Sequence, residues 1–291
     1  MRASAGTAGV LGLNEIKQLY PPTTAYLLTS GICKKSCGFC GNNDRLARIT
    51  WPKYDKNLLL EKLKDAPFER ICLQTVVNKE AQQELKDVLP ELIKTKKPVC
   101  LCSQQGEEYL KLGLDRWTIP LDVADAKLYA SIKGGDWEKE LSHLKALAKK
   151  YPKQIGTHII AGLGETEEQL ILLLADLYSS GISVGLFAFS PVPSTSLEKL
   201  AKPPLDSYRR VQIANFILAK DYQAVDEFSF QNGRLTKAPV ENVEKRAFET
   251  WGCKGCNRPF YNESPKGPWY NYPRALSDTE FAKAIEEAKL I

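Results

Sequence analysis

The chain has 291 residues, of which 43% are hydrophobic and 26% are charged, and its net charge is +5. This composition is ordinary for a folded globular protein. No apolar stretch approaches membrane-spanning length, and no block of lysine and arginine indicates a nucleic-acid footprint.

Strand-like and helix-like segments alternate along most of the chain. The predicted strands are 26–29, 69–76, 98–103, 117–121, 154–161, 183–190 and 227–230. The predicted helices between them are 57–63, 79–93, 107–112, 126–132, 138–149, 166–178 and 207–219. Strands that alternate with helices form a parallel sheet through right-handed crossovers. We therefore expect an α/β fold, a partial or complete (β/α) barrel, whose chemistry lies at the C-terminal ends of the strands.

The expected barrel spans residues 24–231 and follows an N-terminal extension of residues 1–23. Residues 1–13 lack the apolar core of a secretory signal. Residues 232–291 form a C-terminal extension whose first part is rich in Pro, Asn, Gly and aromatic residues. Ser277 and Glu280 have the spacing of a capping box, which predicts a final helix that ends near residue 290.

Cysteine spacing is the most informative feature of the chain. Cys33, Cys37 and Cys40 have the spacing C-x3-C-x2-C and follow the first predicted strand. Three thiolates can hold three irons of a 4Fe–4S cube, and the fourth iron is then free to bind another molecule. A zinc site, or cysteines buried only for packing, are the alternative interpretations. The eight cysteines and their close clusters indicate metal ligands kept reduced, and therefore a cytoplasmic location.

This motif resembles that of the radical S-adenosylmethionine (SAM) superfamily, in which an aromatic residue precedes the last cysteine, as Phe39 does here. The resemblance implies that the three cysteines ligate a 4Fe–4S cluster whose open iron binds SAM. It also implies reductive cleavage of SAM to a 5′-deoxyadenosyl radical, which abstracts hydrogen from an unactivated carbon.

Three further residues match the superfamily's pattern on its fifth strand, where the backbone contacts adenine. Ile160, Gly162 and Glu165 keep the pattern, whereas His158 replaces its first glycine. An ordinary strand-to-helix turn is the alternative interpretation for this segment.

Several segments resemble biotin synthase in particular. Cys72 and Cys100 correspond to its second- and third-strand cysteines, and Asp122 to an aspartate that contacts SAM and substrate. The fifth-strand cysteine of that family falls near Gly156 and is missing here. The residues after the last predicted strand include Arg234, where that family has a cluster-ligating arginine.

A C-x2-C pair, Cys253 and Cys256, lies in the C-terminal extension. Because side chains alternate between the two faces of a strand, Cys100 and Cys102 lie on the same face, and both can point into the barrel. We expect a second, auxiliary iron–sulfur cluster held by the pair and by one or two of Cys72, Cys100 and Cys102. Packing is the alternative interpretation for these three strand cysteines.

The aromatic tail, together with the segment Arg2–Ala8, resembles archaeal-type proteins that form one of two subunits of a lipoyl synthase. The resemblance implies sulfur insertion at carbon 6 or 8 of an octanoyl chain on a lysine of a carrier protein. It implies as partners an octanoylated lipoyl carrier protein or peptide, a second radical SAM subunit, and an electron donor such as ferredoxin or flavodoxin. The alternatives are biotin synthase, another radical SAM reaction, or a non-enzymatic metal-stabilised binding module.

Overall fold

The computed structural model describes residues 1–41 and 45–290. Over these residues the largest sheet has seven strands in the order β1-β2-β5-β6-β7-β8-β9. Its strands are β1 (Arg2–Ala3), β2 (Thr24–Leu28), β5 (Arg70–Gln74), β6 (Val99–Cys102), β7 (Arg116–Thr118), β8 (Ile155–Ala161) and β9 (Ser183–Ala188). The six strands from β2 to β9 are parallel to their neighbours, whereas β1 pairs antiparallel with β2. The parallel sheet and its crossovers confirm the predicted α/β barrel architecture.

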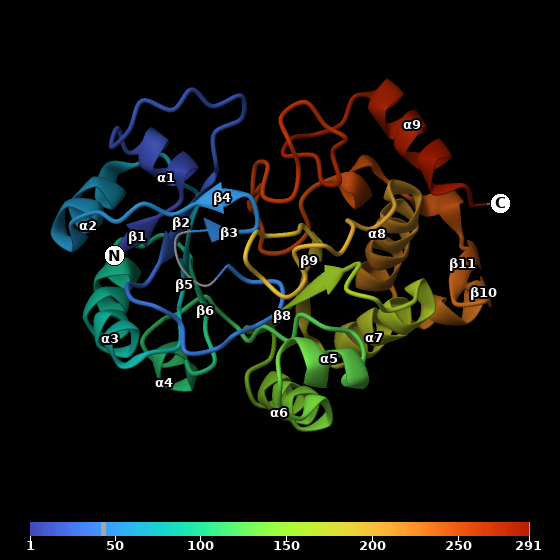
Figure 1. Ribbon diagram of the computed structural model, residues 1–291, viewed down its shortest axis with the longest axis horizontal. Coiled ribbons are helices and arrows are strands. Elements are labelled where there is room, and N and C mark those ends of the chain that lie inside the picture. The colour runs from blue at the N-terminus through green and yellow to red at the C-terminus, as the bar shows by residue number, and fades with distance from the viewer. Residues whose placement is uncertain (42–44, 291) are drawn as a thin grey trace.

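The α-helices lie around the outside of this sheet (Figure 1). They are α1 (Ala5–Val10), α2 (Lys56–Asp65), α3 (Lys79–Lys94), α4 (Glu107–Leu110), α5 (Ala126–Ile132), α6 (Trp137–Lys150), α7 (Glu167–Ser179), α8 (Leu205–Lys220) and α9 (Asp278–Ala288). Short 3₁₀ helices span Tyr222–Glu227, Val240–Asn242 and Lys245–Phe248. Leu, Ile and Val side chains of the strands and of the inner helix faces form one continuous buried core.

Capping residues fix where several helices begin. Asn78 accepts a hydrogen bond from the Ala81 amide at 2.6 Å at the start of α3. Thr166 and Gln169 form a reciprocal capping box at the start of α7. The predicted capping box of Ser277 and Glu280 is confirmed at the start of α9. These side chains satisfy amides that have no partner inside the helix.

The strand predicted at 227–230 does not belong to the large sheet, so its predicted place in the barrel was wrong. Residues Ser229–Gln231 form β10, which pairs only with β11 (Arg234–Lys237) in a separate hairpin. This hairpin packs on α7, where the Leu235 amide donates to the Glu167 carboxylate at 2.9 Å. A second small ribbon pairs β3 (Arg45–Leu46) with β4 (Ile49–Thr50).

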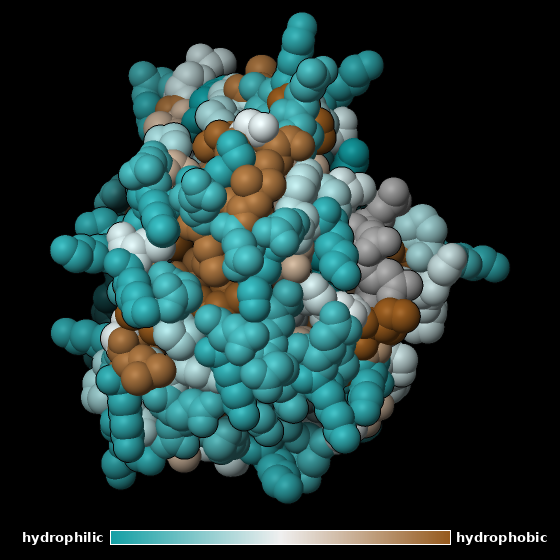
Figure 2. Space-filling view, turned by 90° about the vertical axis from the view of Figure 1, so that its left-hand side faces the viewer, coloured by the Kyte–Doolittle hydropathy of each residue, from teal (hydrophilic) through white to brown (hydrophobic). Residues whose placement is uncertain are grey.

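The edge of the large sheet comes from the N-terminal extension. β1 pairs Arg2 with Leu28 on β2. The buried Arg2 guanidinium donates to the Thr29 carbonyl at 2.6 Å and 3.0 Å. The face on the side of α2 and α3 is mainly hydrophilic and carries a band of hydrophobic residues (Figure 2). No helix in the described part of the chain is long and apolar enough to cross a membrane.

Candidate functional site

The loop of Cys33, Cys37 and Cys40 follows the carboxyl end of β2 and is held from two sides. The Lys34 amide donates to the Val77 carbonyl at 2.8 Å, and the Gly38 amide donates to the Ile132 carbonyl at 2.8 Å. A Cβ at Gly38 would lie 2.6 Å from the Ser196 Oγ, so the close approach of these segments favours glycine. The loop is therefore anchored by backbone contacts at the carboxyl ends of the strands.

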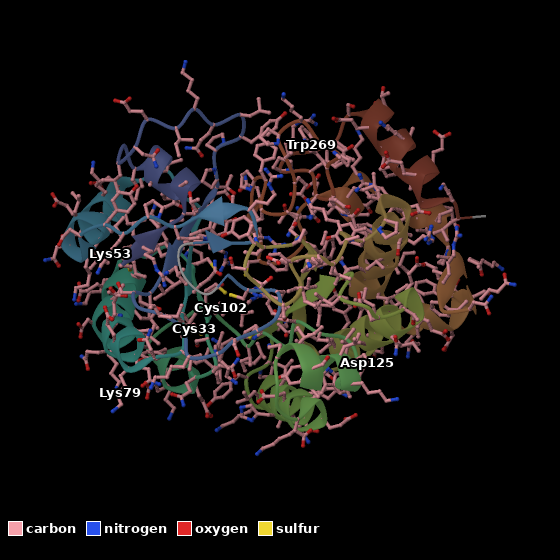
Figure 3. All side chains as sticks on the ribbon, viewed as in Figure 1. Cys33, Lys53, Lys79, Cys102, Asp125 and Trp269 are labelled. Carbon is pink, nitrogen blue, oxygen red and sulfur yellow. The ribbon has the colours of Figure 1, made fainter. Side chains whose placement is uncertain are left out.

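All three cysteines of this loop, and Phe39 with them, line a cavity of about 290 Å³ inside the barrel. The Val77 amide donates to the Cys33 sulfur at 3.3 Å. Burial raises the pKa of the Cys37 thiol, while the nearby Lys133 ammonium opposes that rise. Cys33 lies nearer the centre of the view than Lys53 and Lys79, which lie toward its periphery (Figure 3).

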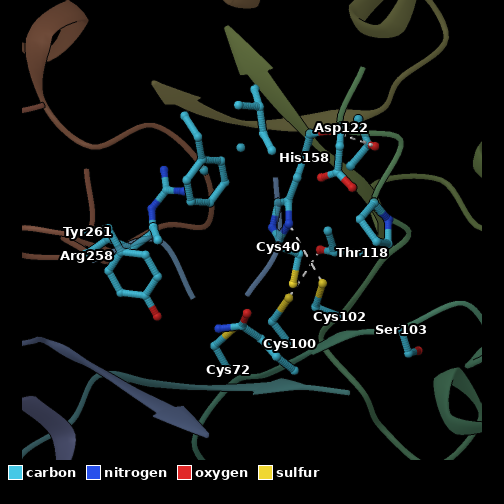
Figure 4. Close-up of a pocket in the computed structure, with 18 of the residues that line it drawn as sticks. Cys40, Cys72, Cys100, Cys102, Ser103, Thr118, Asp122, His158, Arg258 and Tyr261 are labelled. Carbon is cyan, nitrogen blue, oxygen red and sulfur yellow. Dashed lines mark hydrogen bonds between the residues drawn. The ribbon is translucent and has the colours of Figure 1, made fainter. Parts of the chain in front are cut away.

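A second group of thiols lies deeper in the same cavity (Figure 4). Cys72 on β5 and Cys100 on β6 are register partners, so they lie side by side. Cys100 contacts both Cys72 and Cys253 through its sulfur. Cys256 lines the cavity as well, with its sulfur 3.1 Å from the Tyr26 hydroxyl. The structure therefore brings the predicted C-terminal pair to two of the predicted strand cysteines.

The C-terminal pair reaches the barrel because its loop docks on the amino ends of β2 and β5. The Thr23 hydroxyl donates to the Gly255 carbonyl at 2.5 Å, and the Thr23 amide donates to the Asn257 side chain at 3.0 Å. Arg70 donates to the Lys254 carbonyl at 3.2 Å. Since Cys33, Cys37 and Cys40 follow the carboxyl end of β2, the two sulfur groups lie toward opposite ends of the barrel.

Burial makes the deeper thiols hard to ionise. The contact with Cys253 lowers the pKa of Cys100, but the contact with Cys72 and burial outweigh it and raise the pKa to about 12. Burial likewise raises the pKa of Cys256, and the contact with Cys100 together with burial raises that of Cys253. A bound metal cation favours the thiolate form directly, so these thiols would lose their protons on binding iron.

The donor set suits iron–sulfur clusters. Across the described residues, no three His, Cys, Asp or Glu side chains converge closely enough to hold a single metal ion. In an iron–sulfur cluster each thiolate binds a different iron, so the thiolates lie further apart than around one ion. Both groups of thiols offer the soft sulfur donors that iron–sulfur clusters take.

Between the two sulfur groups lies a set of polar side chains. The Cys102 sulfur lies 3.8 Å from His158 Nδ1. Burial lowers the pKa of His158 to about 4, so this imidazole is neutral at neutral pH. The ring of His158 meets that of Phe187 edge-on at 5.0 Å.

Asp122 lines the cavity and pairs with Lys133 at 2.8 Å. The Lys133 ammonium also donates to the carbonyls of Pro120 at 2.5 Å and Leu121 at 3.2 Å. Burial lowers the pKa of Lys133, but the attraction to Asp122 outweighs burial and raises it overall. This pairing leaves one face of the Asp122 carboxylate on the cavity, and its role toward SAM stays a prediction.

The predicted adenine-contacting turn is shaped by its own residues. Ile160 lines the cavity, whereas Gly162 and Glu165 lie outside its wall. The Glu165 carboxylate accepts hydrogen bonds from the amides of Gly162 at 2.6 Å and Leu163 at 2.9 Å. Gly162 has φ +97°, and a Cβ there would lie 2.7 Å from the Pro203 Cδ. Glu165 and Gly162 therefore form the turn, and their contacts with a cofactor stay predictions.

Arg234 lies on the exposed hairpin beside α7. The arginines that line the cavity near the deeper thiols are Arg70 and Arg116, which lie near Cys253, and Arg258, which lies near Cys256. The Arg258 guanidinium lies 3.7 Å from the Phe187 ring centroid and donates to the carbonyls of Leu186 and Trp251. Arg258 and Tyr26 were not among the residues predicted from the sequence. The sequence signal for Arg258 is its position two residues after Cys256.

Comparisons with known proteins show the family of the chain. The family model described as the radical SAM superfamily matches residues 27–177, more than half of the chain. A mitochondrial lipoyl synthase of Nematostella vectensis is 21% identical over 181 residues, 56% of this chain and 60% of that protein. A lipoyl synthase of Christiangramia forsetii is 20% identical over 181 residues, 56% of this chain and 59% of that protein. The chain thus spans about 60% of the length of these relatives.

Solved structures show the same fold. Methylornithine synthase aligns with a TM-score of 0.52 at 19% identity, over 68% of this chain and 62% of that chain. HydG, a maturase of the FeFe-hydrogenase, aligns with a TM-score of 0.53 at 15% identity, over 68% of this chain and 50% of that chain. With the family match, the cysteine loop at the carboxyl end of β2 and the six parallel strands, the chain belongs to the radical SAM superfamily.

Proposed function

We propose that the protein is a lipoyl-synthase-type sulfur insertase that places sulfur into a C–H bond of an octanoyl chain on a carrier-protein lysine. One observation carries this proposal. The C-terminal pair Cys253 and Cys256 joins Cys72 and Cys100 on the wall of the cavity that also holds the loop of Cys33. The names of the two curated relatives, both lipoyl synthases, support the same reaction class.

Each group of thiols has its own part in this proposal. Cys33, Cys37 and Cys40 would hold the SAM-binding 4Fe–4S cluster, and Cys72, Cys100, Cys253 and Cys256 would hold the auxiliary cluster. When bound, these groups and SAM would supply the 5′-deoxyadenosyl radical and the sulfur. Soft thiolate ligands suit iron–sulfur clusters, and four such ligands complete the deeper set.

Part of the cavity wall suits an alkyl chain. Leu28, Val76, Val184 and Phe189 line the cavity, and such apolar walls keep water from a reactive carbon. The neutral His158 is a poor base for a strong proton abstraction at neutral pH, and a hydrogen-atom transfer needs none. The loop of residues 253–257 docks on the amino ends of β2 and β5. A substrate tethered to a protein would therefore enter from the carboxyl end, with the tip of its chain first.

The partners follow from this reaction. An octanoylated lipoyl carrier protein or peptide would be the substrate, and a reduced ferredoxin or flavodoxin would supply electrons. A second radical SAM subunit would act on the other carbon.

The test is anaerobic reconstitution with iron and sulfide, followed by SAM, dithionite and an octanoyl-lysine peptide. We expect deoxyadenosine together with a sulfur-bearing peptide, both measured by mass spectrometry. The variant C253S/C256S should still form deoxyadenosine but no thiolated peptide, because only the deeper thiols are altered.

Two outcomes would favour the alternatives. Deoxyadenosine without sulfur transfer by the wild-type protein would indicate biotin synthase chemistry or another radical SAM reaction. No SAM cleavage at all, with C33A behaving like the wild type, would indicate a metal-stabilised binding module.

A further inference from the structure

The hydroxyl of Tyr26 holds a defined place among the deeper thiols. Tyr26 lies on β2, in register with Cys72, and its side chain is buried. Its hydroxyl oxygen lies 3.1 Å from the Cys256 sulfur and 2.8 Å from the Arg258 amide nitrogen, which donates to it. The hydroxyl thus lies between a backbone donor and a sulfur atom.

These two contacts decide the direction of the bond to sulfur. A tyrosine hydroxyl has one hydrogen to donate and lone pairs to accept with, whereas a backbone amide can only donate. The Arg258 amide therefore uses a lone pair of the Tyr26 oxygen, and the hydroxyl hydrogen is left for Cys256. A metal-bound thiolate carries no hydrogen, so in that form Cys256 can only accept.

The surroundings keep this bond intact. Tyr26 packs in an apolar cluster with Leu28, Trp51 and Tyr261, and Cys72 and Cys256 pack against that cluster. The ring of Tyr26 lies 5.6 Å from that of Tyr261. Because the cluster excludes water, the hydroxyl of Tyr26 meets little competition for the sulfur atom.

We propose that Tyr26 is a positioning residue of the auxiliary site, which orients Cys256 and raises the reduction potential of the cluster held there. This inference rests on the proposed function, because it needs the auxiliary cluster. Hydrogen bonds to the sulfur ligands are one of the means by which proteins set cluster potentials. A donor to sulfur stabilises the more negative, reduced form of the cluster.

The experiment isolates the auxiliary cluster in the variant C33A/C37A/C40A, which lacks the ligands of the SAM-binding one. In this background Y26F removes the hydroxyl that donates to Cys256 and, with it, the acceptor of the Arg258 amide. We expect unchanged iron and sulfide content and a lower midpoint potential in an anaerobic titration followed by electron paramagnetic resonance. Loss of one hydrogen bond to a charged group changes the reduction equilibrium about tenfold, which is about 59 mV for one electron.

The matched control is Y261F, because Tyr261 belongs to the same cluster and no hydrogen bond joins its hydroxyl to a described thiol. Its potential should stay at the background value. A second variant carries 3,5-difluorotyrosine at position 26, which keeps the ring and hydroxyl but donates more strongly. Its potential should rise, opposite in sign to the change in Y26F.

The outcomes separate this inference from the proposed function. If neither Y26F nor the fluorinated variant changes the midpoint potential, the role of Tyr26 is overturned. The auxiliary cluster itself would not be refuted by this result. A triple-cysteine variant that binds no iron refutes the auxiliary cluster and, with it, this inference. A Y26F protein that loses iron, while its apoprotein melts at the temperature of Y261F, overturns the role assigned to Tyr26 in setting the potential, because the cluster content was expected to stay unchanged.

Discussion

Gly162, in the turn after β8, is the position where a single methyl group should most clearly disturb the site. Its φ of +97° is strained for any residue with a Cβ, and a Cβ there would lie 2.7 Å from the rigid Pro203 ring. Gly181, after α7, has φ +73° and no atom within 4 Å of its would-be Cβ. G181A therefore reports the backbone strain alone, and G162A reports the same strain plus the clash.

The magnitude follows from these two contributions. A residue with a Cβ in such a conformation costs about 1–3 kcal/mol. Overpacking against a ring that cannot yield adds about 1–3 kcal/mol. G162A should therefore unfold at a temperature roughly 2–12 °C below that of G181A, taking about 2–4 °C for each kcal/mol.

The assay is thermal unfolding of the apoprotein followed by circular dichroism. The double variant G162A/P203A should recover most of the difference from G181A, because alanine at 203 removes the ring atoms that the new methyl meets. Equal melting temperatures for G162A and G181A, or no recovery in the double variant, would refute the packing that we assign to this turn.

Three further predictions concern the site and its supports. C102S should keep about eight irons per reconstituted chain, whereas C253S/C256S should keep about four, as counted by iron and sulfide analysis. Burial lowers the pKa of His158 from its ordinary value of 6.5 to about 4 in the folded protein, so its neutral form stabilises the fold fully above pH 6.5. That stabilisation should fade as the pH falls from about 6.5 to 4, and it should fade less steeply than the full pKa shift implies because the ring borders the cavity. In H158F, the free energy of unfolding measured in urea should depend less on pH over this range. R210M should destabilise the protein by about 3–5 kcal/mol in urea, because it leaves the mostly buried Glu167 carboxylate, 2.7 Å from Arg210, with the Leu235 amide but without the charge of Arg210.

The parts of the fold that the sequence predicts well are those with local signals. The helix predicted at 126–132 agrees with α5, and the capping box at Ser277 fixes α9, since periodicity and capping depend on neighbouring residues. β1 has two residues and a partner far along the chain, so no local pattern could reveal it. The residues at 227–230 have a sequence pattern that predicts extended backbone, but this pattern does not identify the strand with which they pair.

The candidate site shows the same limit. The spacing of Cys33, Cys37 and Cys40 was sufficient to predict their loop, because all three lie within one short segment. The contact of Cys253 with Cys100 joins residues far apart in the chain, and only the folded C-terminal extension brings them together. Tyr26 belongs to an apolar strand pattern that gives no sign of a functional hydroxyl.

The C-terminal extension is built into the barrel through α8. The fully buried Arg209 on this helix donates to the carbonyls of Tyr270 at 2.8 Å and Trp269 at 2.6 Å, and its pair with Glu287 on α9 measures 2.9 Å. Gln212, one turn later, donates to the same Tyr270 carbonyl at 2.8 Å. These buried bonds fix the aromatic segment, and Thr23 and Arg70 fix the Cys253–Cys256 loop at the amino ends of the strands. The geometry of the deeper thiols thus depends on two anchors at opposite sides of the extension, so the extension is part of the site rather than an accessory to it.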